Sequence, residues 1–480
     1  MSVPIIRATL SVGTKRDVAE ELRMVKIVKM IRKPGNGGRL EPAHAPEPPI
    51  IFFRLQEGIV ELPYHFARSR HLGRWSEDPV VASQHASLDD VLNKSVGGPA
   101  HLSAESRWTG ELRDYQRAIL PELEGQLADH GTTTLGVYPG FGKTAVSAYQ
   151  IARLGFRAVV VLHRAVLLGS WALTFSSMTN LRVAQWTAAT ARKPYPKDCD
   201  VLLCMDTCVH KIPPEERRRF GTLVMDEAHL LCTESRRDLF FDFGAVEYII
   251  MCTATLARPD GMHSMVVQTV GQHGIFLGNP VDFDLIRVRT TFSPDIDGGR
   301  AIMSAKGLDS ADTASVWLAI LYSLAFDEER NAFLADLVAC RLKDRKVIVL
   351  TFLAEHIEKL VPALAAAGET DVATLYRSQN TYEDARVLIG TASKISVGFD
   401  PNGTCVNWGG RKFDALVLCT SIAGLAPMIQ TFGRCFRADH PVIYYINDRH
   451  GIIDNHWKGA VAYAEGNHGT VVPWKAEATS

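Results

Sequence analysis

The sequence predicts an α/β protein made of two tandem doubly wound parallel sheets, preceded by a small N-terminal α+β accessory domain. From Leu112 onward, short apolar runs alternate with segments of helical periodicity, which is the pattern of consecutive βαβ units. Several runs are continuous Val, Ile and Leu, as expected for parallel strands that are covered on both faces. The series restarts after residues 278–284, and two α/β units of ~150–200 residues each fit the remaining length.

Each α/β unit has an expected order of strands and helices. The first unit has predicted helices at 143–153 and 164–175, and predicted strands at 133–138, 158–163, 201–205, 222–225 and 248–252. The second unit has a predicted helix pair across 316–340, and predicted strands at 346–351, 373–376, 386–390, 415–419 and 442–447. The glycine pairs at 298–299 and 409–410 are predicted to be surface turns. The predicted domains are therefore residues 1–107, 108–280 and 281–480.

The first predicted domain, residues 1–107, is poorly periodic. Residues 1–40 hold nine Lys or Arg against three Asp or Glu, and a proline-rich run covers residues 42–49. Two strands are predicted after this run, at 50–55 and 58–62. The basic segment is either a grip on duplex DNA or a solvated face with a flexible tail, and the residues favour neither interpretation.

Composition excludes several classes of protein. The 480 residues are 46% hydrophobic and 22% charged, which is ordinary for a globular protein and unlike a disordered chain, collagen or a coiled-coil rod. The chain has 52 Lys and Arg against 53 Asp and Glu, and the net charge of −1 argues weakly against nucleic acid as a partner.

Apolar segments and cysteines in the sequence indicate the cellular compartment that is expected. No apolar window is long enough for a transmembrane helix, and the N-terminus lacks the apolar core of a signal peptide, so no membrane partner is expected. The nine cysteines are scattered, which predicts a reduced intracellular location without zinc and without a disulfide-linked partner.

Residues 139–144, Pro-Gly-Phe-Gly-Lys-Thr, lie between a predicted strand and a predicted helix, which is the setting of a phosphate loop. Gly140 and Gly142 let the backbone wrap around an anion, toward which the N–H groups and the helix N-terminus point. Lys143 would reach the β- and γ-phosphates of ATP, and the Thr144 hydroxyl would hold Mg²⁺. Val137 stands where the full motif has its first glycine, so the alternative is a glycine-rich turn before a helix.

An acidic pair follows another apolar strand, roughly 80 residues further on. Asp226 is positioned for the metal ion, and Glu227 is the candidate base for the attacking water. Phosphoryl transfer also needs positive charge, which Arg434 and Arg437 of the second unit would supply. These arginines are predicted to share one helical face, although a solvated arginine pair is the alternative.

Taken in order, these residues resemble the motifs of a superfamily 2 helicase or translocase with two RecA-like domains, and the likeness covers roughly residues 112–447. Motif II reads Asp-Glu-Ala-His at residues 226–229. The resemblance implies that Gln116 reads the adenine of ATP. It implies an ATP site that also includes Gly140, Gly142, Lys143, Thr144, Asp226, Glu227, Gly398, Asp400, Gln430, Arg434 and Arg437. It implies backbone contacts to DNA from Arg164, Thr207, Thr391 and Lys394.

Motif III narrows the resemblance to a DNA-acting group. Residues 253–261 read Thr-Ala-Thr-Leu-Ala-Arg-Pro-Asp-Gly, and little sequence follows the last predicted strand. The group contains phage UvsW, XPB-type repair and transcription helicases, and poxvirus-type transcript-release helicases. Residues 327–331, Asp-Glu-Glu-Arg-Asn, are also similar to its viral members. A large DNA virus is therefore the expected source, with the virion or the infected host cell as the expected location.

The resemblance implies a motor that hydrolyses ATP between its two α/β units and moves 3′-to-5′ along DNA. One hypothesis is an ATP-dependent DNA helicase or reannealing translocase. Another is a transcript-release, transcription or repair factor that uses the same motor, or an RNA helicase. A scaffold with a degenerate ATPase is disfavoured, because Lys143, Asp226 and Glu227 are all present. A motor that releases DNA in each cycle needs only a local cationic track, so the net charge of −1 does not exclude it.

Overall fold

The computed structural model describes most of the chain after residue 98 and short pieces before it. The described residues are 7–9, 26–27, 30–32, 40–42, 50–52, 54–56, 59–61, 63–65, 99–243, 246–254, 256, 258, 260–308, 313–396 and 399–474. The chain forms two compact units, which we name unit 1 and unit 2. Unit 1 comprises Met1–Val137 and Phe141–Leu277, and unit 2 comprises Tyr138–Gly140 and Gly278–Ser480.

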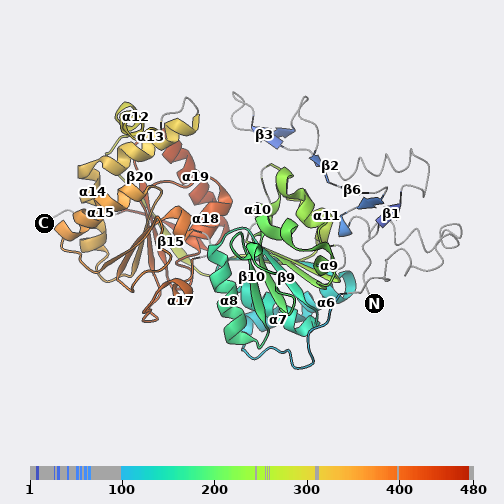
Figure 1. The fold of residues 1–480 in the computed structure, drawn as a ribbon. Coiled ribbons are helices and arrows are strands. Elements are labelled where there is room, and N and C mark those ends of the chain that lie inside the picture. Colours follow the sequence, from blue (N-terminus) through green and yellow to red (C-terminus); the bar gives the residue numbers. More distant parts are fainter. Residues whose placement is uncertain are drawn as a thin grey trace, which may run out of the picture. The chain divides into compact units, whose positions relative to one another are not determined.

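Unit 1 is built on a seven-stranded parallel sheet with the order β10-β11-β9-β12-β13-β8-β14 (Figure 1). Its strands are β8 (Thr132–Val137), β9 (Ala158–Leu162), β10 (Val183–Trp186), β11 (Val201–Met205), β12 (Thr222–Met225), β13 (Tyr248–Thr253) and β14 (Ile275–Leu277). Its helices include α5 (Asp114–Ala118), α6 (Leu120–His130), α7 (Lys143–Leu154), α8 (Val166–Met178), α9 (Pro214–Arg217), α10 (Ala228–Leu231) and α11 (Ser264–Val270).

Helices cover both faces of this sheet, as Figure 1 shows with α10 and α11 on one side and α7 and α8 on the other. Alternate residues of a strand point to opposite faces. Val159 and Val161 of β9 therefore share one core cluster with Leu231, Met265 and Val266 of α10 and α11. The other face meets α7 and α8, which contact β12 and β11. The prediction that continuous apolar runs form parallel strands buried on both faces is confirmed.

Unit 2 is built on a second seven-stranded parallel sheet, with the order β17-β18-β16-β19-β20-β15-β21. Its strands are β15 (Phe283–Arg289), β16 (Val347–Thr351), β17 (Val372–Leu375), β18 (Val387–Thr391), β19 (Ala415–Leu418), β20 (Val442–Asn447) and β21 (Gly469–Pro473). Its helices are α12 (Ile296–Ala305), α13 (Thr313–Phe326), α14 (Glu328–Asp336), α15 (Ala354–Ala366), α16 (Ala392–Ile395), α17 (Pro401–Thr404), α18 (Leu425–Phe432) and α19 (Gly451–Gly466). Residues of α14 and α15 pack on one face, and residues of α18 and α19 pack on the other.

The two sheets share one topology. Adding seven to each strand number of unit 1 gives the order of unit 2, so β15 is the counterpart of β8 and β20 is the counterpart of β13. Two open parallel sheets with helices on both faces are tandem RecA-like domains, and the predicted fold class is confirmed.

One turn prediction was wrong. Gly298 and Gly299 lie inside helix α12, not in a surface turn. Gly299 is buried, and a Cβ at this position would overlap the carbonyl oxygen of Ala319 in α13. The glycine therefore allows two helices to approach closely, which a pattern of turn-forming residues does not reveal.

The described part of the N-terminal segment contains short antiparallel pairs. They are β1 (Arg7–Thr9) and β6 (Arg54–Gln56) on either side of β7 (Ile59–Glu61), then β2 (Lys26–Ile27) with β5 (Ile50–Ile51), and β3 (Met30–Arg32) with β4 (Leu40–Pro42). Phe52 is buried in the core of unit 1, with its ring 5.4 Å from that of Phe240 and 5.3 Å from that of Phe241. Tyr64 joins the same cluster. The separate accessory domain and its DNA-binding role stay predictions.

All nine cysteines are free thiols, and seven of them are buried. Cys340 is exposed and Cys405 is half-buried. Burial raises the pKa of Cys232, Cys252 and Cys419 to about 12, so these thiols stay protonated at neutral pH. Among the described residues, none of the helices combines the length and the apolarity that crossing a bilayer requires.

Candidate functional site

The glycine loop joins the end of β8 to the start of α7, two elements of unit 1. Gly140 has φ 91° and Gly142 has φ 95°, a left-handed conformation that favours glycine. A Cβ on Gly142 would also overlap Nε2 of Gln116, so this position needs glycine for space as well as for φ. The loop therefore opens onto the N-terminus of a 12-residue helix, where unpaired N–H groups favour an anion.

Two side chains of the first turn of α7 are available to a nucleotide. Lys143 Nζ donates to the carbonyl of Val137 at 3.4 Å, a long and weak hydrogen bond that a phosphate would replace. Thr144 is half-buried, and within the described residues its hydroxyl makes no hydrogen bond. An ammonium group and a free hydroxyl beside a helix N-terminus fit the phosphates and Mg²⁺ of a bound nucleotide.

Gln116 lies against the glycine loop rather than in open solvent. Its Nε2 donates to the carbonyl of Phe141 at 2.8 Å, and its Oε1 accepts from the backbone N–H of Arg113 at 2.9 Å. The ring of Tyr115 lies edge-on to that of Phe141, with 5.2 Å between centroids. The amide still has one N–H to donate, and its role as the adenine contact stays a prediction.

Asp226 follows β12, two strands from β8 in the sheet. One carboxylate oxygen accepts from Trp171 Nε1 at 2.8 Å, and the other accepts from the backbone N–H of Glu227 at 3.0 Å. Burial, followed by the charge of Glu227, raises the pKa of Asp226 to about 6, against the opposing effect of Lys143. A buried carboxylate that resists ionisation is a site where a bound cation is strongly favoured, so Asp226 fits a Mg²⁺ ligand.

Glu227 carries two signs of a functional residue. Its φ is 49°, which is strained for a residue with a Cβ. Its Oε2 is buried, and within the described part of the chain it has no hydrogen-bond partner. A carboxylate oxygen held without a donor costs free energy unless a ligand or water completes it, so Glu227 fits the base that receives a proton from water.

His229 joins motif II to the end of β13. Its Nδ1 lies 2.9 Å from the hydroxyl of Thr253, and its backbone carbonyl accepts from Arg258 at 2.6 Å. Burial, and then the charges of Arg258 and Lys143, lower the pKa of His229 to about 4, so the ring is neutral at pH 7. Arg258 also pairs with Asp260 at 2.6 Å. Through His229, motif II and motif III are therefore connected by hydrogen bonds.

The predicted nucleic-acid residues of unit 1 lie beyond the carboxyl ends of β9 and β11. Thr207 is exposed and Arg164 is half-buried. Between these strand ends, the buried Asp206 accepts from Arg236 Nε at 2.6 Å and lies 2.9 Å from His163 Nδ1. Sequence reasoning missed Asp206 as the group that organises this edge. Its signal was an acidic residue directly after a continuous apolar strand.

Motif VI of unit 2 differs from its prediction in local structure. Helix α18 ends at Phe432, and Arg434 and Arg437 lie in the turn that follows, so the prediction of a shared helical face was wrong. Hydrogen bonds between residues three apart, such as Arg434 N–H to the carbonyl of Thr431, replace the helical pattern there.

The two arginines have different partners. Arg434 donates to the carbonyls of Phe399 and Ser396 at 2.7 and 2.6 Å, whereas Arg437 pairs with Asp400 at 2.7 Å. Gln430 is buried, and its Nε2 has no partner within the described ranges. Gly398 lies outside the described residues. Hydrogen bonds and an ion pair therefore connect motif VI to motif V, and the Arg437 side chain is partly exposed.

Two further predicted contacts of unit 2 lie at the end of β18. Thr391 is buried, with its hydroxyl 3.1 Å from that of Ser393. Lys394 is half-buried, and its ammonium donates to the carbonyl of Gln379 at 2.6 Å. A phosphate would compete with this carbonyl, and both roles stay predictions.

These features define the class of protein. A glycine loop at a helix N-terminus and an acidic pair two strands away give unit 1 the arrangement that P-loop ATPases with tandem RecA-like domains use to bind a nucleotide.

Comparison with known proteins narrows the class. Residues 109–258 match the family described as "Type III restriction enzyme, res subunit". The chain is 25% identical over 398 residues to the predicted helicase 161L of Invertebrate iridescent virus 6, covering 77% of this chain and 84% of that protein. It is 26% identical over 165 residues to the predicted ATP-dependent RNA helicase QP509L of African swine fever virus, covering 34% of this chain and 32% of that protein.

A solved structure shares the fold. It is the ATP-dependent Type ISP restriction-modification enzyme LlaBIII bound to DNA, with a TM-score of 0.50, 12% identity, and coverage of 77% of this chain and 32% of that chain. The motif order, the viral relatives and the fold together resemble those of a superfamily 2 helicase.

Proposed function

We propose that the protein is an ATP-dependent DNA helicase or translocase that moves 3′-to-5′ and separates or reanneals strands. The observation that carries the proposal is the grouping of Lys143, Asp226 and Glu227 beside the glycine loop. DNA is favoured over RNA by the longer form of motif III, in which Arg258 pairs with Asp260. The likeness to a predicted RNA helicase supports RNA as the alternative substrate.

The chemistry of the site follows from its donors and acceptors. Lys143 and the loop N–H groups bind the β- and γ-phosphates, while Thr144 and Asp226 hold Mg²⁺. When bound, the metal ion offsets the charge that develops on the phosphates. Glu227 orients the attacking water and accepts its proton at Oε2. Arg437 stabilises the transferring phosphoryl group, Arg434 keeps motif V in register, and Gln430 uses its unpaired N–H on the nucleotide or on water.

The test is ATP hydrolysis by the full chain with and without DNA. Lys143→Ala is expected to abolish hydrolysis and to leave the fold intact, because the side chain makes one weak hydrogen bond. Lys412→Ala is the matched control, since Lys412 is an exposed lysine before β19. Full turnover by Lys143→Ala would overturn the proposed ATPase.

A strand-displacement assay separates the alternatives. Tailed duplexes of both polarities are used with DNA and RNA tracking strands, and 3′-tailed DNA is expected to be unwound. Unwinding on RNA tails alone would establish the RNA helicase. ATP hydrolysis stimulated by DNA, without strand separation, would favour the translocase or the transcript-release factor.

The viral relatives support a viral source for this chain. The virion or the infected host cell follows as the proposed location.

A further inference from the structure

Because the two units share one topology, the carboxyl ends of β15 and β20 in unit 2 correspond to the ends of β8 and β13 in unit 1. In unit 1 the glycine loop follows β8, which is next to β13. The chain continues from β8 to β9 on one side of the sheet and from β13 to β14 on the other, and ligands of α/β sheets bind beyond strand ends at such switch points. In unit 2 the counterparts β15 and β20 are also adjacent, and they continue in opposite directions to β16 and β21.

A pocket lies at this second switch point. It has a volume of about 890 Å³, and its walls come from the ends of β15 and β20 and from α19. Its lining includes four basic residues, Arg287, Arg289, Arg449 and Lys458, against two acidic residues, Asp448 and Asp454. The lining of the pocket therefore has more basic than acidic residues, whereas the whole chain has a net charge of −1.

The acidic residues of the pocket are already paired. Asp454 accepts from Arg287 at 2.6 Å. Arg289 and Arg449 are exposed, and neither guanidinium has an acidic partner among the residues that the structure describes. Arg287 and Arg289 point to the same side of β15, and burial followed by the charge of Arg289 lowers the pKa of Arg287. An anion between these groups would relieve that repulsion.

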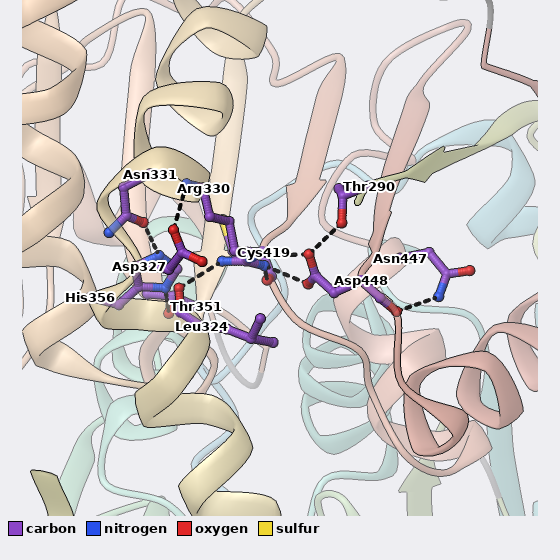
Figure 2. Close-up of polar contacts among 10 residues, drawn as sticks. All are labelled: Thr290, Leu324, Asp327, Arg330, Asn331, Thr351, His356, Cys419, Asn447 and Asp448. Carbon is purple, nitrogen blue, oxygen red and sulfur yellow. Dashed lines mark hydrogen bonds and ion pairs between the residues drawn. The ribbon is translucent and has the colours of Figure 1, made fainter. Parts of the chain in front are cut away.

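A buried ion pair fixes the floor of the pocket. Figure 2 shows the Arg330 side chain pointing toward the carboxylate of Asp448, with Thr290 on the other side of that carboxylate. Both partners of the pair are fully buried, their closest atoms are 2.9 Å apart, and Thr290 donates to Asp448 at 2.7 Å. Arg330 also donates to the carbonyl of Cys419 at the end of β19. Arg330 therefore connects the carboxyl ends of β19 and β20, and Asp448 connects them to the end of β15.

The same contacts exclude a second site for ATP. The loop after β15 reads Thr-Thr-Phe-Ser-Pro, without glycine or lysine. The carboxylate of Asp448 is held by Arg330 and Thr290, so it is not free to bind Mg²⁺. Exposed arginines in an open pocket suit the phosphodiester backbone of a strand that passes over the surface.

We propose that Arg289 and Arg449 bind backbone phosphates of nucleic acid at the position in unit 2 that corresponds to the glycine loop of unit 1. This site rests on the proposed function, since it serves a motor that moves on nucleic acid. It adds a contact at β15 and β20 to those predicted at the end of β18. Arg330 is its positioning residue and touches no phosphate.

The test compares two double variants of the full chain. Arg289→Ala/Arg449→Ala removes two exposed charges from the pocket. Lys343→Ala/Lys412→Ala removes two exposed charges that precede β16 and β19, at the amino ends of the strands and therefore away from the pocket. Binding of a fluorescent tailed DNA duplex, and of its RNA equivalent, is measured as a function of salt concentration. Binding of a fluorescent ATP analogue with Mg²⁺ is measured in parallel.

The pocket variant is expected to bind DNA about 10-fold more weakly, with a salt slope smaller by about 1 to 2, because each lost phosphate contact lowers that slope by about 0.7 to 0.9. Its affinity for the ATP analogue should not change. Equal affinity and salt slope in the two double variants would overturn the site, as would weaker binding of the ATP analogue with unchanged DNA binding. A wild-type protein that hydrolyses ATP without stimulation by nucleic acid contradicts the proposed motor, whereas the pocket is still judged by the binding data.

Discussion

Replacing Trp171 by Phe removes the hydrogen bond that the indole donates to Asp226. The indole is completely buried, and its Nε1 lies 2.8 Å from the carboxylate. A hydrogen bond to a charged group contributes about 1.5 to 3 kcal/mol, and leaving the acceptor buried without a donor costs a similar amount. Since about 1.4 kcal/mol corresponds to one pKa unit, the loss raises the pKa of Asp226 from about 6 to about 7 or above.

The expected consequence is a defect in hydrolysis that grows as the pH falls. At pH 7 about half of the variant molecules or more would carry a protonated Asp226, which binds Mg²⁺ poorly. The assay measures kcat and the half-saturating Mg²⁺ concentration between pH 6 and 8.5. We expect Trp171→Phe to need about 10-fold more Mg²⁺ at pH 7 and to recover toward pH 8.5.

Trp186→Phe is the matched control. Trp186 is also buried in unit 1, but within the described residues its Nε1 has no hydrogen-bond partner. Both variants remove the same atoms from a core, so both change packing, and only the first changes Asp226. If the two variants share one Mg²⁺ dependence and one pH profile, Trp171 does not position Asp226.

Three further predictions concern Asp226 itself and two arginines, Arg330 and Arg437. Asp226→Asn is expected to abolish hydrolysis and to remove the contribution of this carboxylate to the pH dependence of stability, which is on the order of 1 to 3 kcal/mol between pH 4 and pH 8. The folded-state pKa of Asp226 is raised to about 6, so the wild-type penalty exists above that pH and fades as the pH falls toward 4; chemical unfolding of both proteins at both pH values measures the difference. Arg330→Met should lower the free energy of unfolding by about 3 to 5 kcal/mol because it leaves Asp448 buried and unpaired, and a loss below about 1 kcal/mol in urea unfolding would contradict this. Arg437→Ala breaks a half-exposed pair with Asp400, so thermal unfolding should hardly change while kcat falls by about 10³-fold with ATP binding retained; an unchanged kcat would remove Arg437 from the catalytic roles.

Sequence patterns predicted most central strands and the edge strand β17, and missed the other three edge strands. The strands over 201–205, 222–225 and 442–447 match their predicted bounds, because buried parallel strands are continuous apolar runs. Strands β10, β14 and β21 were not predicted. These three strands lie at sheet edges, where exposed positions interrupt the apolar pattern. Strand β15 was missed because charged residues alternate with its buried Phe283, Leu285 and Val288.

The residues of the candidate site could be predicted where they belong to short sequence motifs. A glycine loop and an acidic pair are short motifs, so Lys143 and Asp226 could be named from their neighbours alone. The partner of Asp226 is Trp171, 55 residues away, and the partner of Arg330 is Asp448, 118 residues away. Only the packing of helices on the sheet brings such pairs together, so a reading of local patterns could not join them.

The distribution of cysteines makes unit 2 selectively addressable by thiol chemistry. Cys340 is the one exposed thiol of the nine, and seven others are sealed in the cores. A hydrogen bond to Asp336 is the main cause that raises the pKa of Cys340, so maleimide labelling should be slow at pH 7 and faster at alkaline pH. With Cys405 replaced by Ser, a dye can be attached to unit 2 without touching the buried cysteines. A second cysteine introduced on the surface of unit 1 would then report, by energy transfer, the distance between the units during each ATP turnover.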